Sequence, residues 1–198
     1  PGPMQNGVGG SAMHAVFDQR RYLIPFRATL LPQIFTDVLV IGAGVAGLRA
    51  ALAAGEQGEV IVATKAEWSQ SSTYWAQGGI VYRGSDDSPE LLAEDIVRAG
   101  ASHCNPEAVR ILAEKGPDLL EETLMERVGV EFDRNGDGSL SLVQEGSHSV
   151  PRIVHAADAT GRSVQEAFQT EVRNHPNIRL LAEHTAIDLL TPSHHARN

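Results

Sequence analysis

The feature that most constrains the fold of this chain is a glycine-rich turn directly after a short apolar run. Residues 37–41 (Asp-Val-Leu-Val-Ile) are typical of a buried parallel strand. The turn, residues 42–47, leads into the helix-favouring stretch 48–54. Residues 60–63 (Val-Ile-Val-Ala) predict a second buried strand. The sequence therefore predicts an α/β fold that begins with a compact βαβ unit and contains a parallel sheet.

The three glycines of this turn have the spacing that dinucleotide binding requires. Gly42 allows a tight turn, Gly44 lets the backbone approach a pyrophosphate, and Gly47 lets the helix pack closely on the strand. Amide groups at the start of the helix then face the phosphate charge. Glycines in an ordinary strand-to-helix turn are the alternative, and the position of the motif between a strand and a helix argues against it. We expect a Rossmann-like domain that binds a dinucleotide.

The end of the second strand narrows the choice of dinucleotide. A carboxylate at this point usually holds a ribose in NAD sites. The strand here continues as Ala63-Thr64-Lys65, without Asp or Glu. A plain NAD site is therefore disfavoured.

The middle of the chain predicts a helical insertion. Ser88 and Asn105 each precede a proline and a glutamate, which is the pattern of a capping side chain followed by proline at the first helical position. We expect helices over about 89–100 and 106–115. The pair Gly116-Pro117 is expected to end the second helix, and a further helix should reach about residue 127.

A hairpin is expected after these helices. Residues 130–132 and 139–143 flank the glycine-bearing turn 133–138. The turn copies the first half of a calcium loop, but Gln144 stands where that loop needs a bidentate glutamate. A hairpin turn is the favoured interpretation, and no metal site is predicted.

The two ends of the chain complete the expected organisation. A helix is predicted over about 162–174 and strands over 178–181 and 186–190. Residues 1–36 contain no apolar run resembling a signal-peptide core or a membrane span, so we interpret them as a flexible leader. Residues 37–198 are expected to form the folded domain.

Charge and cysteine content bear on partners and compartment. The formal net charge of −9 lacks the basic footprint of a nucleic-acid binder, so no nucleic-acid or membrane partner is expected. Cys104 is the one cysteine and cannot form an internal disulfide. We expect a cytoplasmic chain in which Cys104 is a small buried apolar residue.

Residues 71–80 carry a second motif, Ser-Ser-Thr-Tyr-Trp-Ala-Gln-Gly-Gly-Ile. Small, hydroxyl and amide side chains of this kind can wrap a flat polar ring, although a plain Ser/Gly loop would look similar. With the glycine turn upstream, the segment resembles the fumarate reductase and L-aspartate oxidase group of flavoproteins, over residues 37 to about 190. The resemblance implies FAD, with contacts at Ala43, Gly44, Val45, Ala46, Lys65, Ser72, Thr73, Tyr74, Trp75, Ala76, Gln77, Gly78 and Gly79.

Position 72 separates members of this group. Succinate dehydrogenases and quinol-linked fumarate reductases carry a histidine just before the threonine of this segment, and that histidine bonds covalently to the flavin. This chain has Ser72 there. The resemblance therefore implies non-covalent FAD and favours the L-aspartate oxidase branch. The Thr64-Lys65 ending matches the group as a whole, so the missing carboxylate after the second strand is expected.

A third motif lies in residues 144–161 and resembles the L-aspartate oxidase family most specifically. Its pattern is Glu-Gly-x-His-Ser followed by Arg-Ile-x-His-Ala-x-Asp-x-Thr-Gly. Glu145 can meet a substrate ammonium as a carboxylate, a role that the resemblance also implies. His148 is a candidate catalytic or structural residue, with neither favoured.

The other polar residues of this motif have structural interpretations. His155 is expected to be a hydrogen-bonded structural histidine, and Arg152 to pair with a neighbouring carboxylate as an alternative to a substrate role. Asp158 is interpreted as a brace for the loop. Thr160 with Gly161 is expected to cap the next helix.

The resemblance implies FAD-dependent oxidation of L-aspartate to iminoaspartate, with oxygen or fumarate as acceptor. The product would enter quinolinate and NAD synthesis, which makes quinolinate synthase the expected pathway neighbour. A fumarate reductase-like flavoprotein and a non-catalytic, truncated FAD-binding fragment are the alternatives. Family members are longer and carry a substrate-capping domain and a catalytic arginine absent here, so the family fold is expected to be incomplete and the chain alone inactive.

Overall fold

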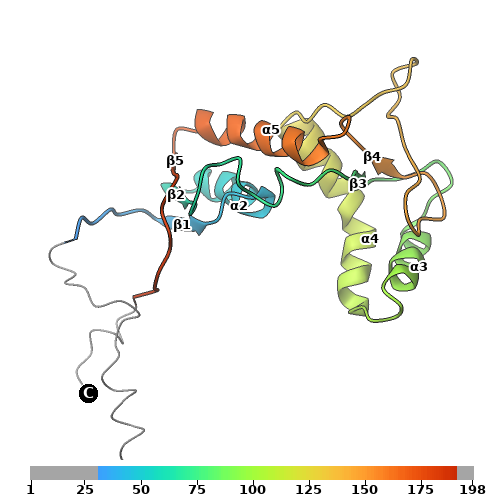
Figure 1. Cartoon of the computed structure of the whole chain (residues 1–198), viewed down its shortest axis with the longest axis horizontal. Helices are drawn as coiled ribbons and strands as arrows, with labels where there is room; N and C mark the ends of the chain where they lie inside the picture. Colours follow the sequence, from blue (N-terminus) through green and yellow to red (C-terminus); the bar gives the residue numbers. More distant parts are fainter. Residues whose placement is uncertain (1–30, 191–198) are drawn as a thin grey trace, which may run out of the picture. The chain divides into compact units, whose positions relative to one another are not determined.

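The computed structural model describes residues 31–190, of which residues 36–184 form one compact unit and residues 31–35 and 185–190 belong to another. The elements of the larger unit are shown in Figure 1. In chain order they are β1 (Val38–Ile41), α2 (Val45–Gly55), β2 (Val60–Ala63), β3 (Ile80–Val81), α3 (Pro89–Ala99), α4 (Pro106–Leu120), the π-helix η2 (Glu121–Arg127), β4 (Ile153–Val154), α5 (Thr160–Asn174) and β5 (Ile178–Leu181).

A three-stranded parallel sheet with the order β1-β2-β5 organises the unit. Helices α2 and α5 pack against each other and share one core with the sheet. Leu48 and Leu52 of α2 meet Phe168 of α5 there, each without exposed surface. The predicted α/β class with a parallel sheet is confirmed.

The prediction that β1 is buried was wrong. Leu39 is 56% exposed and Ile41 is 65% exposed, whereas Val60 and Val62 of β2 are buried. β1 pairs with β2 on one side only, and within residues 31–190 no other strand pairs with its second edge. An apolar strand needs a covered face as well as an apolar sequence to be buried.

A helical insertion separates β3 from β4, as predicted. Ser88 accepts a hydrogen bond from the amide of Leu91, and Asn105 caps α4 in the same way. The expected break at Gly116-Pro117 is absent, because α4 continues to Leu120 and passes directly into η2. Pro117 costs one backbone hydrogen bond. Pro117 is nevertheless buried within α4, and the π-helix η2 begins four residues after it.

The predicted hairpin turn is confirmed in a reduced form. Asn135 donates its amide to the carbonyl of Ser139 at 2.8 Å, and Arg134 pairs with Leu140 in an isolated antiparallel bridge. The flanking residues do not form extended strands. Val143 instead pairs with Ile153, the first residue of β4, which also pairs with β3.

Two predictions near the end of the chain were wrong. Thr160 does not cap α5, because Ala159 is the N-cap residue and the Thr160 hydroxyl accepts from the amide of Ala156 at 3.1 Å. Residues 186–190 form no strand, since no neighbouring strand in the described part of the chain supplies hydrogen bonds to them. Among residues 31–190, no helix has the length and apolar character needed to cross a bilayer.

Candidate functional site

The glycine turn has the geometry that its spacing predicts. Gly42 has a φ of +107°, which favours glycine, and its amide donates to the carbonyl of Ala63 at 2.8 Å. A Cβ added at Gly47 would collide with the carbonyl of Gly42. The turn therefore requires glycine at both positions, and it brings α2 tightly against the end of β1.

The start of α2 offers amide groups to a ligand. Gly44 is the N-cap residue and has no capping side chain, and the first turn contains no acidic residue. The amide of Val45 donates to the Thr73 hydroxyl at 3.1 Å. For Ala46 and Gly47, no protein acceptor of the amide is found among the described residues. Unpaired amides at a helix start favour an anionic group such as a phosphate.

Residues 71–79, here called the flavin segment, lie against this turn. A Cβ on Gly44 would come within 3.3 Å of the Thr73 hydroxyl, so the Thr73 side chain packs closely on the backbone of the turn. Gln165, which is fully buried on α5, donates to the carbonyl of Ala43 at 2.6 Å and accepts from the Ser71 hydroxyl at 3.1 Å. The Ser71 hydroxyl in turn accepts from the amide of Tyr74. Gln165 thus ties the glycine turn to the flavin segment.

A second contact holds the flavin segment on α5. The amide of Gly161 donates to the carbonyl of Ala76 at 3.0 Å. A Cβ on Gly161 would collide with the carbonyl of Thr73 and come within 2.6 Å of that of Ala76. The guanidinium of Arg162 lies over the ring of Tyr74 at 5.2 Å. Gly161 therefore serves close packing, whereas the sequence suggested a capping role.

The residues predicted to contact FAD fall into groups. The first group, residues 43–47 and Thr73, forms the glycine turn and the contacts described above. Lys65 is exposed just beyond β2, and no polar partner of its side chain is found within residues 31–190. Gly79 packs on β4, where a Cβ would collide with the side chain of Ile153. The exposed members of the flavin segment are Ser72, Trp75, Ala76, Gln77 and Gly78.

These features fit a bound dinucleotide. Bare backbone at the helix start, unpaired amides and an adjacent polar segment with five exposed residues leave room and donors for a phosphate-bearing ligand.

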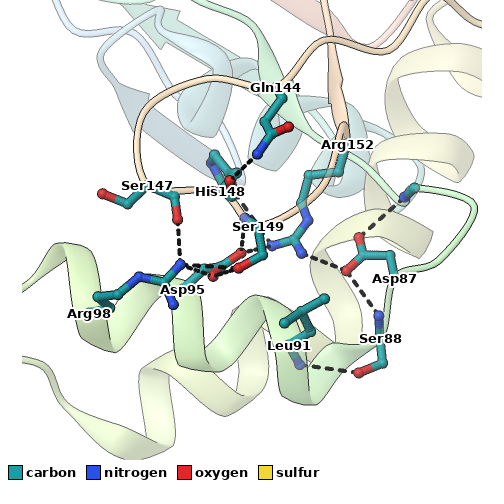
Figure 2. Close-up of polar contacts among 11 residues, drawn as sticks. Asp87, Ser88, Leu91, Asp95, Arg98, Gln144, Ser147, His148, Ser149 and Arg152 are labelled. Atoms are coloured by element: carbon teal, nitrogen blue, oxygen red, sulfur yellow. Dashed lines mark hydrogen bonds and ion pairs between the residues drawn. The ribbon is translucent and has the colours of Figure 1, made fainter.

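The loop of residues 144–149 carries the predicted substrate residues. Glu145 is exposed, and its carbonyl accepts from the amide of His148 at 3.1 Å. The Gln144 side chain donates to the carbonyl of His148 at 2.7 Å and closes the loop on itself (Figure 2). Gly146, at a φ of +51°, makes the turn between them. The loop is a compact hydrogen-bonded turn that presents Glu145 at the surface.

Arg152 anchors this loop through its contacts with His148 and Asp95. Its side chain has no exposed surface and lies between Asp87, at 2.7 Å, and Asp95, at 2.9 Å (Figure 2). Its NH1 also lies 3.4 Å from Nδ1 of His148. Because an arginine can only donate, a neutral His148 in this contact carries its proton on Nε2. The alternative interpretation of Arg152, pairing with a carboxylate, is confirmed.

Asp95 of α3 is a buried carboxylate with several donors. Its oxygens accept from the amide of Ser149 at 2.7 Å, from the Ser149 hydroxyl at 2.6 Å and from Arg98. Burial by itself raises the pKa of this carboxyl. The Ser149 hydroxyl and amide, then Arg98 and the charge of Arg152, outweigh burial and lower the pKa to about 2. Asp95 is therefore ionised at neutral pH.

The remaining polar residues of the third motif have structural positions. His155 Nδ1 lies 3.0 Å from the carboxylate of Asp133, in agreement with the structural interpretation. Asp133 also accepts from the amide of Ala157 at 3.0 Å. Asp158 is exposed and no partner of its carboxylate is found among the described residues, so the predicted brace was wrong. Asp133 braces this turn instead.

The two predicted parts of the site are connected through the small sheet. The flavin segment leads into β3. The 144–149 loop leads through residues 150–152 into β4, and these two strands pair antiparallel. Within residues 31–190, no polar contact joins Glu145 or His148 to the glycine turn or to the flavin segment. The structure thus builds a cradle that fits a dinucleotide and a separate loop that carries the predicted substrate residues.

Sequence reasoning missed four residues that hold these parts in place. Gln165 interrupts the apolar face of α5, and a buried glutamine in such a position signals a hydrogen-bonding duty. Asp95 occupies a buried face of α3 in the same way. The sequence offers no comparable signal for Asp87 or Asp133, whose partners lie far along the chain.

Comparisons with known proteins agree with this geometry. The family model described as FAD binding domain matches residues 37–197. The chain is 46% identical over 158 residues to L-aspartate oxidase 2-b, chloroplastic, of Nicotiana tabacum, covering 79% of this chain and 24% of that protein. It is 42% identical over 161 residues to L-aspartate oxidase of Vibrio cholerae, covering 78% of this chain and 30% of that protein.

A solved structure shows the same fold. A quinol-fumarate reductase with menaquinol molecules matches with a TM-score of 0.73 and 31% identity, over 81% of this chain and 28% of that one. The chain spans about a quarter to a third of the curated relatives above, 24% and 30% of their lengths. The cofactor predicted from the motifs, FAD, is confirmed by the family model and the flavoprotein neighbour. The chain belongs to the FAD-binding domain family of flavoproteins that includes the L-aspartate oxidases and fumarate reductases.

Proposed function

We propose that this chain is the amino-terminal part of the FAD-binding domain of an L-aspartate oxidase. The whole protein oxidises L-aspartate to iminoaspartate, and oxygen or fumarate takes up the two electrons. FAD, when bound, supplies the hydride-accepting chemistry. The contribution of this chain is to hold the cofactor and to present polar groups to the amino acid.

The cradle holds FAD without a covalent bond in this proposal. The amides of Ala46 and Gly47 would donate hydrogen bonds to the pyrophosphate. Gly42 and Gly44 have no side chains that would block its approach to the backbone. The remaining cofactor set consists of Ala43, Val45, Lys65 and residues 72–79. Ser72 stands where covalent members of the group carry histidine, and a serine offers no ring nitrogen for that bond.

The loop residues take the substrate roles. Glu145 is exposed and has no side-chain partner among residues 31–190, so its carboxylate is free to pair with the α-ammonium of L-aspartate. His148 offers an Nε2 proton to a substrate carboxylate, because Arg152 lies against its other ring nitrogen. Holding the ammonium and a carboxylate fixes the orientation of the Cα–H bond that is broken.

The observation that carries this proposal is the similarity to L-aspartate oxidases across the domain that contains the cradle and the loop. The experiment is a substrate comparison with the FAD-loaded whole protein. L-aspartate should be consumed and iminoaspartate formed, detected as the oxaloacetate and ammonia to which it hydrolyses. D-aspartate and L-glutamate serve as matched negative substrates. Retained FAD without turnover of L-aspartate would contradict the proposal and favour a non-catalytic FAD-binding protein.

A fumarate reductase-like activity is the second candidate, because a quinol-fumarate reductase shares this fold with a TM-score of 0.73. The two candidates differ in the direction of electron flow. Reduction of fumarate by a dye donor, with no oxidation of L-aspartate, would favour this alternative. Activity in both assays agrees with an L-aspartate oxidase that uses fumarate as acceptor.

The proposed reaction product indicates which enzyme acts next. Iminoaspartate is unstable in water, so an enzyme that consumes it, quinolinate synthase in the synthesis of NAD, is the proposed pathway neighbour. The proposed FAD-binding part is residues 37–198, and most of the predicted leader, residues 1–36, lies outside the described residues. A cytoplasmic location also stays a prediction, since the tobacco relative is named as chloroplastic.

A further inference from the structure

The 144–149 loop depends on a few polar contacts to keep its position. Within the described residues, all polar contacts that leave this loop go to Asp95 and Arg98 of α3 or to Arg152. Gln144 and His148 close the loop internally, so it can move as one piece. The position of Glu145 and His148 is therefore set where the loop is attached to α3.

Asp95 dominates this attachment. It is 2% exposed and accepts both the amide and the hydroxyl of Ser149, at 2.7 and 2.6 Å. It also pairs with the fully buried Arg152 at 2.9 Å. Charge-assisted hydrogen bonds of this kind are about twice as strong as neutral ones, and burial removes competing water.

Arg98 is the weaker anchor. It donates to the carbonyl of Ser147 at 2.7 Å and to the Ser149 hydroxyl at 3.1 Å, but its side chain is 56% exposed. Exposed charged contacts contribute little to stability, because solvent and salt screen them. The buried carboxylate on the neighbouring turn of α3 therefore decides where the loop lies.

We propose that Asp95 is a positioning residue for the substrate: through Ser149 and Arg152 it fixes the loop that carries Glu145 and His148. This inference rests on the proposed function. Asp95 touches neither substrate nor cofactor in this account. It acts because Glu145 meets the ammonium group only when Ser149 is held on α3.

The test compares three variants of the FAD-loaded whole protein. D95N removes the buried charge, and S149A removes one donor while leaving every charge in place. E94Q is the matched control, since Glu94 is the adjacent residue of α3, is exposed, and has no polar contact with the loop among residues 31–190. For each variant, hydrogen exchange of residues 144–149 and the dissociation constants of L-aspartate and succinate are measured. Succinate has both carboxylates of aspartate but no ammonium group.

D95N should speed exchange in residues 144–149 and raise the dissociation constant of L-aspartate about tenfold, and S149A should raise it about threefold. Succinate should lose affinity by a smaller factor than L-aspartate, because displacing the loop removes only the His148 contact with a carboxylate of succinate, whereas L-aspartate also loses the Glu145 contact with its ammonium group. E94Q should match the wild type in both measurements. Unchanged flavin absorption in D95N and S149A shows that the cradle is intact.

Two results would overturn the inference. One is wild-type exchange and affinity in D95N and S149A. The other is an equal loss of affinity for both ligands, which indicates general destabilisation. If D95N does not fold, S149A decides between these outcomes alone. A wild type that holds FAD but neither binds nor oxidises L-aspartate refutes the proposed function itself, which is a different result from an active wild type with unaffected variants.

Discussion

The cradle and the substrate loop are held in place by different physics. The cradle relies on close backbone approach, with glycines at Gly47 and Gly161 and neutral hydrogen bonds from Gln165. The loop relies on buried charge, with Arg152 between Asp87 and Asp95. Steric contacts tolerate little variation and persist at any pH, whereas a charge cluster depends on every partner and on protonation. The two regions should therefore fail under different perturbations.

Removing the buried arginine should give the largest effect. R152M leaves Asp87 and Asp95 without their shared cation, and an uncompensated buried charge costs about 3–5 kcal/mol of unfolding free energy. Urea denaturation measures this loss. The control is R110A, because Arg110 also has two carboxylate partners but is 52% exposed, and its loss should cost far less unfolding free energy than the loss of Arg152. Equal costs for R152M and R110A would contradict the distinction drawn from burial.

A methyl group at Gly161 should give the next largest effect, on the cradle. Alanine raises helix propensity by about 1 kcal/mol, but its Cβ would collide with the carbonyl of Thr73, and overpacking costs about 1–3 kcal/mol. We expect G161A to lower FAD affinity by at least about tenfold, measured by fluorescence titration with FAD. G116A is the control, since a Cβ at Gly116 would meet no atom within 4 Å apart from its chain neighbours and the backbone of its own helix. Normal FAD affinity in G161A would refute the close-packing role.

Gln165 should have a smaller effect on the same region. Q165L leaves the carbonyl of Ala43 without its donor, which costs about 1–2 kcal/mol. The loss should appear as weaker FAD binding, together with a lower unfolding temperature. Q169L changes the next turn of α5, where no hydrogen bond of the side chain is found within residues 31–190, and should leave FAD binding unchanged. A smaller loss of FAD affinity in Q165L than in Q169L would show that Gln165 does not hold the cradle together.

Acid should affect the loop in a narrow pH range, and this is the smallest expected effect. Asp95 faces Arg98 and Arg152, and its pKa lies at about 2 against an ordinary 3.8. A lowered folded-state pKa contributes stability that is present above 3.8 and lost as the pH falls towards about 2. The difference in unfolding free energy between wild type and D95N should therefore shrink over this range. A constant difference between pH 5 and pH 2 would contradict the assignment.

Much of this fold follows from local sequence rules. Ser88 and Asn105 begin helices because their side chains and the following prolines determine the first turn. Gly42 fixes the turn because only its backbone adopts the required φ without strain. These features depend on neighbours a few residues away, and the sequence displays them directly.

The features that sequence reasoning missed depend on distant partners. Pro117 reads as a helix breaker, yet the surrounding packing keeps α4 continuous. The position of Asp95 on α3 does not identify its partner, because Arg152 lies fifty-seven positions later in the chain. The apolar run around Leu39 predicts a buried strand, although Leu39 is exposed and nothing in the described part of the chain covers it. Long-range contacts of this kind leave no periodic signal.

The most direct test of the account is anaerobic mixing of the FAD-loaded whole protein with L-aspartate, followed by flavin absorption. The wild type should lose its oxidised flavin absorption within one turnover. E145Q should retain FAD but be slowed by at least about a hundredfold at low substrate, because the ammonium loses its charged partner. An FAD-loaded wild type that keeps its oxidised spectrum would contradict the account. Equal rates in E145Q would contradict the role of the loop.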